Sequence, residues 1–314
     1  MTNPAAADRT LLTNLTLSRA VHDRAEHLRF DHAAWQVIAS EPSTPTIVVH
    51  GSRVPVIGDP VALLRSPLGE VPWPHTLVLL AVESDIPIVA ALVAREVEVE
   101  LPQAERWGDL RELGAVLSDA DAGLLVTAIA LAHWHASHQH CPTCGRAVTV
   151  ANAGWAGVCP EHGEQHPRTD PAVIVLVRDA DDRALLGRRG EWTQGWYSTL
   201  AGFVEAGESA EQAVAREVAE ESNIAVDPTS LVYLGSQPWP FPRSLMLGYH
   251  AFTADASTAK PDGDEITEVR WFTRDELAAG CATGEVRIPP RVSVARRLIE
   301  RWYGAELPGE WSRP

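Results

Sequence analysis

The chain has 314 residues and a formal net charge of -16, with 45% hydrophobic and 22% charged residues. This length exceeds one ordinary hydrophobic core, so the sequence predicts two or three domains of ordinary globular composition. The acidic balance excludes proteins that hold polyanions by diffuse attraction, so a phosphate-bearing substrate would need a local cation or a bound metal.

The targeting features indicate a cytoplasmic protein. Residues 1–9 lack the basic start and the apolar core of a secretory leader. The longest apolar stretch, residues 122–134, is shorter than the ~20 residues of a membrane span, so we expect a buried helix and no membrane partner. The four cysteines are too few for a disulfide scaffold, and three of them lie within nineteen residues, which predicts bound metal in a reducing cytoplasm.

The first third of the chain predicts a few strands and one long helix. Apolar runs bounded by turns with proline and glycine predict strands at residues 46–50, 76–82 and 86–93. Helical periodicity follows over residues 119–138, with Ser118 as the N-cap and Asp121 at the third position. No residue of this part indicates chemistry by itself, so we interpret it as a scaffold or a dimer surface.

A segment rich in cysteine and histidine follows. Two knuckles of the form C-x2-C and C-x2-H, fourteen residues apart, offer the ligands Cys141, Cys144, Cys159 and His162. An intervening hairpin would bring the knuckles together into a closed structural Zn2+ site with no open position for water. His162 is the least secure ligand, because His140 and His166 lie close enough to replace it. The alternative is four incidental residues in a loop.

After the cysteine-rich segment, the pattern of apolar residues changes to one with more predicted strands. Strands are predicted at residues 172–178, 183–188, 197–203, 231–236, 244–252 and 266–272. Helices are predicted at residues 210–222 and 293–303. Because strands and helices do not alternate steadily, the pattern favours an α+β or sandwich arrangement. Cys281, apart from the other cysteines, is interpreted as a buried free thiol.

The helix at residues 210–222 carries an unusual acidic face. Ser209 and Gln212 form a capping box, and an apolar stripe follows that would pack on a sheet. Glu217, Glu220 and Glu221 share the opposite face at i, i+3 and i+4. Like charges so placed oppose the helix, and they lie near its C-terminus, where the dipole disfavours anions. A divalent cation between the carboxylates would remove both penalties; the alternative is a solvated acidic face.

The context of this helix is more specific than a carboxylate cluster. With its preceding loop it resembles the Nudix box, G-x5-E-x7-R-E-U-x-E-E-x-G-U, at Gly202, Glu208, Arg216, Glu217, Glu220 and Glu221. One position departs, because Asn223 stands where the family has glycine. Glycine turns left-handed there after the helix, and asparagine is the next best residue for that turn. We therefore expect the departure to leave activity intact.

Residues 236–244 form the unusual string Ser-Gln-Pro-Trp-Pro-Phe-Pro-Arg-Ser. Alternate prolines would leave Trp239 and Phe241 on one extended edge that could line a pocket for a planar base. Gln237 and Ser244 would offer hydrogen bonds; the alternative is a rigid turn between two strands. The string resembles the S-Q-P-W-P-F-P-x-S signature that follows the box in the NADH pyrophosphatase (NudC-type) family of Nudix hydrolases. Zinc ribbon, box and string resemble that family in this order from about residue 110, whereas the first third resembles it only in length and position.

The resemblance implies a three-domain α+β chain, usually a homodimer. It implies an N-terminal α/β domain (residues 1–137), a small zinc ribbon (138–167) and a C-terminal Nudix α/β/α sandwich (168–314). It implies that Mg2+ or Mn2+ is held by the backbone carbonyl of Ala201 and by Glu217, Glu220, Glu221 and Glu265, with Glu268 as the alternative to Glu265. The implied substrate contacts are Phe203, His166, Arg111, Ala295, Gln237, Pro238, Trp239, Pro240, Phe241, Pro242, Arg243 and Ser244.

The implied reaction is cleavage of the pyrophosphate of NAD(H) to AMP and NMN(H), and also removal of NAD caps from RNA 5′ ends. Metal would neutralise the diphosphate oxygens and lower the pKa of a bound water. Glu221 or Glu220 would take the proton as general base. Arg216 would orient Glu208 or Glu217 rather than contact phosphate. No long basic track is visible, so contact with RNA beyond the cap should be slight.

Two other classes of protein fit the sequence less well. A Nudix-fold ligand sensor would have lost glutamates of the box, and all are present. A zinc-ribbon nucleic-acid-binding protein would carry a basic surface, whereas residues 141–167 contain one arginine, Arg146, besides histidines.

Overall fold

The computed structural model describes residues 9–13 and 15–311. The first eight residues, on which most of the argument against a secretory leader rests, lie outside this description. The chain groups into two compact units. Of the described residues, the C-terminal unit comprises those up to Ser18 with 170–238 and 244–311, and the N-terminal unit comprises 19–169 with 239–243. The three-domain division stays a prediction beside these two units.

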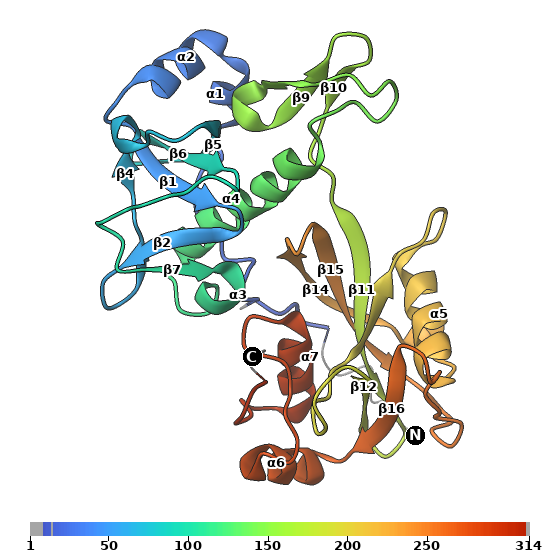
Figure 1. Ribbon diagram of the computed structural model, residues 1–314. Helices are drawn as coiled ribbons and strands as arrows, with labels where there is room; N and C mark the ends of the chain where they lie inside the picture. Colours follow the sequence, from blue (N-terminus) through green and yellow to red (C-terminus); the bar gives the residue numbers. More distant parts are fainter. Residues whose placement is uncertain (1–8, 14, 312–314) are drawn as a thin grey trace. The chain divides into compact units, whose positions relative to one another are not determined.

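The N-terminal unit contains a mixed sheet (Figure 1). Its strands run in the order β3-β2-β1-β6-β5, with bounds Ala62–Leu63, Arg53–Ile57, Pro45–His50, Ile86–Val93 and His75–Glu83. Two short strands pair off this path: β4 (Ser66–Pro67) with β1 and β7 (Arg106–Asp109) with β2. β1 and β6 are parallel. The three strands expected from the sequence are confirmed within one residue at each end.

Four helices accompany this sheet: α1 (Glu26–Phe30), α2 (His32–Ser40), α3 (Leu110–Leu113) and α4 (Asp119–Ser137). The Ser118 side chain accepts from the Asp121 N–H at 3.1 Å, so the expected N-cap of α4 is confirmed. Leu125 and Ile129 of α4 are fully buried, which confirms the interpretation as a core helix. Across the described part of the chain, every helix is too short or too polar to cross a membrane.

The cysteine-rich segment forms a three-stranded antiparallel sheet. Its strands are β8 (Thr149–Ala151), β9 (Ala156–Cys159) and β10 (Gly163–Gln165), in the order β10-β9-β8. The hairpin of β8 and β9 is the connection that the spacing of the two knuckles predicts.

The C-terminal unit is built on a second mixed sheet. Its strands run in the order β14-β15-β11-β12-β16, with bounds Val232–Trp239, Ser244–Phe252, Asp170–Arg178, Ala184–Arg189 and Ile266–Phe272. β13 (Leu200–Phe203) pairs with β11. Its helices are α5 (Ala210–Ser222), α6 (Arg274–Thr283) and α7 (Val294–Tyr303). Helix α6 was not expected from the sequence, and β13 begins three residues later than expected.

Helices cover both faces of this sheet. Val173 and Val175 of β11 belong to the core that contains α5, whereas Ile174 and Leu176 belong to the core that contains α6 and α7. Successive side chains of a strand point to opposite faces, so a continuous apolar run is what a strand covered on both sides requires. The unit is therefore an α/β/α sandwich, as expected.

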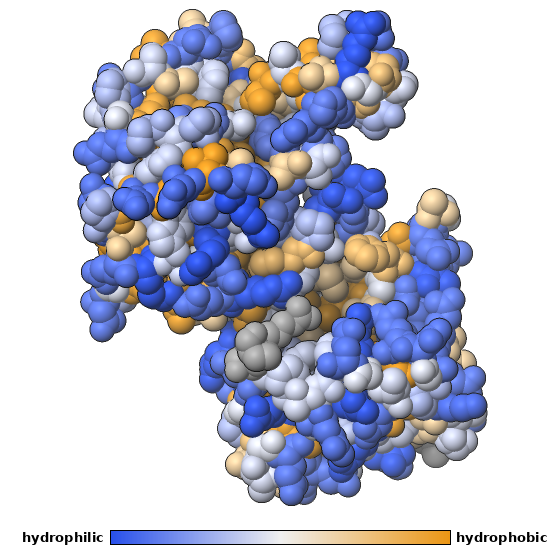
Figure 2. Space-filling model, viewed as in Figure 1, coloured by the Kyte–Doolittle hydropathy of each residue, from blue (hydrophilic) through white to orange (hydrophobic). Residues whose placement is uncertain are grey.

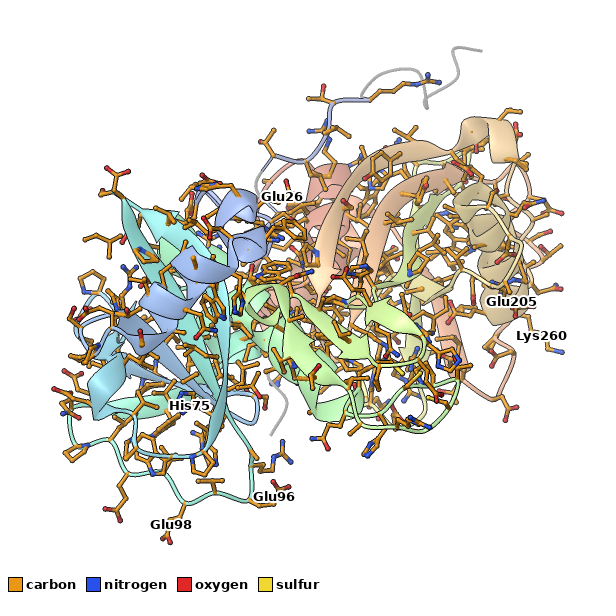
Figure 3. All side chains as sticks on the ribbon, turned by 90° about the horizontal axis from the view of Figure 1, so that it is seen from above. Glu26, His75, Glu96, Glu98, Glu205 and Lys260 are labelled. Atoms are coloured by element: carbon orange, nitrogen blue, oxygen red, sulfur yellow. The ribbon has the colours of Figure 1, made fainter. Side chains whose placement is uncertain are left out.

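Charged and polar side chains dominate the surface that Figure 2 shows. Glu96 and Glu98 project outward from the loop between β6 and β7 (Figure 3), and both are exposed. This loop adds negative charge to the N-terminal unit, in agreement with the acidic composition.

Candidate active site

Helix α5 is fixed at both ends by its own sequence. At the N-terminus, Ser209 and Gln212 exchange the two hydrogen bonds of a capping box, at 2.8 and 3.2 Å. At the C-terminus, Asn223 adopts the left-handed conformation, with φ 56° and ψ 21°. The expectation that asparagine can replace the family glycine there is confirmed.

Arg216 lies at the centre of the acidic face and contacts three carboxylates. Its guanidinium donates two hydrogen bonds to Glu208, both at 2.9 Å. It also donates to Glu217 at 2.8 Å, to Glu220 at 2.9 Å and to the carbonyl of Phe203 at 2.9 Å. Glu208 and the other carboxylates raise the pKa of Arg216. The arginine therefore holds three glutamates and the end of β13 in fixed positions, and its donors are directed at carboxylates.

Glu221 lies on the buried side of this face. It is 4% exposed, and its carboxylate accepts one hydrogen bond from the Ala201 N–H at 3.2 Å. Burial, together with the negative charges of Glu265 and Glu217, raises the pKa of Glu221 to about 8. Burial also raises the pKa of Glu217. The site thus keeps two carboxylates, those of Glu217 and Glu221, in surroundings that disfavour their charge, which is typical of functional positions.

The two downstream candidates for a metal ligand differ. Glu268 accepts from the Tyr197 hydroxyl at 2.5 Å and from Arg188 at 3.1 Å, and these contacts lower its pKa. Glu265 is paired with Arg189, and its negative charge acts on both Glu217 and Glu221. The surroundings of Glu265 favour it over Glu268.

Gly202 provides the space that Glu217 occupies. A Cβ built on Gly202 would lie 1.9 Å from Cδ of Glu217 and 2.0 Å from Oε1. The first glycine of the box is therefore a steric requirement, because any side chain there would displace a carboxylate.

We expect Gly202→Ala to lower turnover while the fold persists. The added methyl group must push Glu217 aside, and a shift of about 1 Å at an active site can cost about 100-fold in rate. Steady-state kinetics and a thermal melt would check this. Gly248→Ala is the matched control, since its Cβ would meet its nearest atom at 3.3 Å. Equal activity of the two variants would contradict the steric role.

The residues present suit a divalent hard cation. The donors are carboxylate oxygens, which Mg2+ and Mn2+ prefer. A buried carboxylate with one hydrogen bond is costly, and a cation would offset that cost. In this structure Arg216 contacts Glu217 and Arg189 contacts Glu265. In the part of the chain described, the oxygens of the glutamates of this site do not all lie within 4.8 Å of one another.

We expect the metal-free protein to lose stability as the pH rises from about 4.5 to about 8. Glutamate ionises near 4.5 in ordinary surroundings, whereas the pKa of Glu221 is raised to about 8 by burial. Between these values the folded protein retains a proton that the unfolded chain releases, so rising pH favours unfolding. Glu221→Gln should remove this loss and raise the melting temperature at pH 8 by about 5 °C. Calorimetry with a chelator would check it; identical melting curves of both proteins at pH 8 would contradict it.

The second cluster of ligands lies in the N-terminal unit. The sulfur and Nδ1 atoms of four residues lie within 4.8 Å of one another: Cys141, Cys144, Cys159 and His162. The Sγ atoms of Cys144 and Cys159 are 3.7 Å apart, and Nδ1 of His162 is 3.7 Å from the Sγ atoms of Cys141 and Cys159. Tetrahedral Zn2+ with Zn–S bonds of ~2.3 Å gives ligand separations of about 3.8 Å.

The acid–base state of Cys141 also suits a metal. Burial opposes ionisation of this thiol, but N–H groups and neighbouring thiols outweigh it and lower its pKa to about 6. A thiolate is the form that binds Zn2+. His166, an alternative ligand in the sequence, is exposed and lies 3.8 Å from Glu164. The cluster therefore contains His162 rather than its neighbour His166.

Residues 236–239 of the string lie in β14 and Ser244 begins β15, whereas residues 240–243 form a turn between the two strands, so the expectation that Trp239 and Phe241 share one extended edge was wrong. Trp239 ends β14, and the chain turns at once into β15, with the Phe241 N–H donating to the Trp239 carbonyl at 2.7 Å. The rings of Trp239 and Phe241 contact each other edge to face at 4.9 Å. Three stiffening prolines suggested an extended edge, but the local turn reverses the chain.

Residues of the N-terminal unit hold this turn. The guanidinium of Arg111 lies 3.8 Å from the Phe241 ring centre and 5.1 Å from that of Trp239. His133 is 3.1 Å from the Pro242 carbonyl. The structure thus brings Arg111 together with the two aromatic residues of the string, as three of the contacts implied by the resemblance.

Gln237 lies elsewhere. It is 0% exposed, accepts from the Leu17 N–H at 3.2 Å and donates to the Val292 carbonyl at 3.0 Å. Its amide therefore has partners within the C-terminal unit. Ala295 is also buried, in the first turn of α7, whereas Phe203, the residue after the first glycine of the box, is 58% exposed.

Three residues that contact the two downstream glutamates were not expected from the sequence: Arg188, Arg189 and Tyr197. The two consecutive arginines of β12 were the one visible signal, and nothing local indicates their partners near residue 265.

Two protein-family models match the sequence. The model of the NUDIX domain matches residues 168–292, and that of the NADH pyrophosphatase-like rudimentary NUDIX domain matches residues 38–134. The chain is 39% identical to the NAD-capped RNA hydrolase NudC of Mycobacterium bovis, over 98% of this chain and 100% of the relative. It is 41% identical to the NudC of Stutzerimonas stutzeri, over 68% of this chain and 72% of that one. A NAD-capped RNA hydrolase of Macaca fascicularis is 37% identical, over 59% of this chain and 42% of that protein.

Proposed function

Because the chain belongs to the NudC-type family of Nudix hydrolases, we propose that it cleaves the pyrophosphate of NAD(H) to AMP and NMN(H). We propose that it also removes the NAD cap from RNA 5′ ends, the activity named for its relatives. The observation that carries this is the intact acidic face of α5, in which Arg216 holds Glu208, Glu217 and Glu220 while Glu221 is buried beside Ala201.

Mg2+ or Mn2+ would be held by the backbone carbonyl of Ala201 and by four carboxylates, those of Glu217, Glu220, Glu221 and Glu265. Bound metal supplies neutralisation of the diphosphate oxygens and acidification of a water molecule. Burial raises the pKa of Glu221 to about 8 in the metal-free protein, and Glu221 is proposed as the general base. Glu220 is the alternative base, and it is more exposed and tied to Arg216. Arg216 orients the carboxylates and does not contact substrate.

The turn at residues 239–243 is proposed to recognise a planar base. Trp239 and Phe241 offer ring faces, and Arg111 offers a guanidinium plane beside them. Gln237 would act by fixing the end of β14, because its amide already has partners. The remaining contacts of the proposed substrate set are Phe203, His166, Ala295, Pro238, Pro240, Pro242, Arg243 and Ser244.

The Cys/His cluster is proposed to hold structural Zn2+, and the chain to form a homodimer in the cytoplasm. Phe30 and Val37, on α1 and α2, are 65% and 67% exposed and supply apolar surface for such a contact. The proposed Zn2+ site has four protein ligands and therefore no position for a catalytic water.

We expect the protein to release AMP from NADH with Mg2+ or Mn2+ and to do so at no measurable rate with a chelator. It should prefer NADH over ADP-ribose and diadenosine diphosphate at subsaturating concentration. Trp239→Ala should lose most of that preference, since stacking of a base contributes about 1–3 kcal/mol. Chromatography of the products would measure all three substrates.

Tyr233→Ala is the matched control, because Tyr233 lies on the same strand but outside the string. It should keep the wild-type ranking of the substrates. An unchanged ranking in Trp239→Ala would contradict base recognition by the turn, and absence of metal-dependent AMP release from the wild type would contradict the proposed function itself.

A further inference from the structure

Arg189 stands outside every motif of the sequence, yet it contacts the metal site. It ends β12 and forms an ion pair with Glu265. The register of β12 and β16 shifts at this residue, because Arg188 is opposite Glu268 whereas Arg189 is opposite Ile266. Such bulges redirect side chains next to active sites. The irregularity gives two neighbouring arginines different glutamate partners.

The charge of Arg189 reaches more than one carboxylate. Its positive charge acts on Glu221 and opposes the burial that raises the pKa of that residue. Arg216 donates hydrogen bonds to the carboxylates of Glu208, Glu217 and Glu220, and its positive charge compensates theirs. Between them the two guanidinium groups act on each carboxylate of the site in this metal-free arrangement.

The ion pair between Arg189 and Glu265 is easily broken. The side chain of Arg189 is 37% exposed and that of Glu265 is 51% exposed. Exposed ion pairs contribute little to stability, so a divalent cation of higher charge can displace the arginine. A guanidinium that remained in place would repel that cation.

We propose that Arg189 is a placeholder for the divalent cation: it neutralises Glu265 in the metal-free protein and must leave that carboxylate when metal binds. This rests on the proposed function, since it assumes a metal at the box. Arg189 is a positioning residue that acts through Glu265. Its presence weakens metal binding and keeps the carboxylates in place when no metal is bound.

Binding of Mn2+ to the full-length protein without substrate, followed by electron paramagnetic resonance of free Mn2+, tests this. Arg189→Gln should lower the dissociation constant for Mn2+ about five-fold, because it removes a positive charge that repels the divalent ion from a distance of ~6 Å. Arg189→Lys keeps the charge and should restore most of the wild-type affinity. Arg188→Gln is the matched control, because it removes the same charge one residue away but from Glu268, and it should leave the affinity unchanged.

Glu265→Gln separates this inference from the proposed function. That variant should bind Mn2+ more weakly, and adding Arg189→Gln to it should tighten binding less than in the wild type. If Arg189→Gln binds no tighter than the wild type, or Arg188→Gln tightens binding equally, the placeholder role is overturned while metal binding by the wild type stands. If the wild type itself binds no Mn2+, the proposed function and this inference fail together.

Discussion

Glu221→Gln should lower kcat for NADH by about three orders of magnitude, within the range that general acid–base groups contribute. Glutamine keeps the size and the hydrogen bond from the Ala201 N–H, but it can neither bind a proton nor offer a charge to metal. The same substitution should stabilise the metal-free protein at pH 8, because it removes the buried carboxylate that ionises on unfolding. A variant that is less active and more stable is the pattern of a site that sacrifices stability for function.

Rapid-quench measurement of AMP formation with saturating Mn2+ would check this. Glu211→Gln is the control, because Glu211 is an exposed glutamate in the first turn of the same helix. It should keep wild-type turnover. Near-normal activity of Glu221→Gln would contradict the assigned base, and Glu220→Gln would then be the variant to measure.

Cys141→Ser should abolish tight zinc binding and destabilise the N-terminal unit. Structural zinc supplies on the order of 10 kcal/mol of apparent folding free energy, which exceeds the stability of many whole domains. The thiol lies within 4.8 Å of its three partners, so its loss leaves three ligands. We expect low solubility and little zinc in the purified variant, with the chemistry of any folded enzyme less affected.

Metal analysis by mass spectrometry and a melt with and without chelator would measure this. Cys281→Ala is the matched control, since Cys281 is a buried free thiol in α6 outside the cluster. It should retain one zinc per chain. Wild-type protein purified without chelator but free of zinc would contradict the assignment of the cluster.

The elements with strong local signals were predictable. The continuous apolar run of β11 and the capping box of α5 each require no distant partner to be recognised. Helix α6 was missed because few of its positions are apolar and buried, notably Leu277 and Cys281. Its signal was nevertheless present, since Thr273 and Glu276 form a second capping box that precedes it.

The parts that could not be predicted depend on distant pairs. Gln237 bonds to Leu17, 220 residues away, and this partner makes a candidate substrate contact a buried structural amide. Arg189 and Glu265 meet because β12 and β16 pair with a shifted register. The periodicity of apolar residues and the spacing of motif residues describe one segment at a time. They therefore do not indicate which side chains from distant segments form hydrogen bonds or ion pairs with each other.

The residues just before Ser18 have a consequence for how the chain is made. Leu12 bonds to the Leu234 carbonyl at 2.8 Å, and Thr16 bonds to the Arg291 carbonyl at 2.8 Å. Thr16 leaves the ribosome 275 residues before Arg291, so this segment is synthesised well before its partners. At translation rates of 5–20 residues per second, they wait roughly 10 to 50 s for those partners. Most of the N-terminal unit can fold during this interval, and the sandwich closes around this segment only after Arg291 has been synthesised.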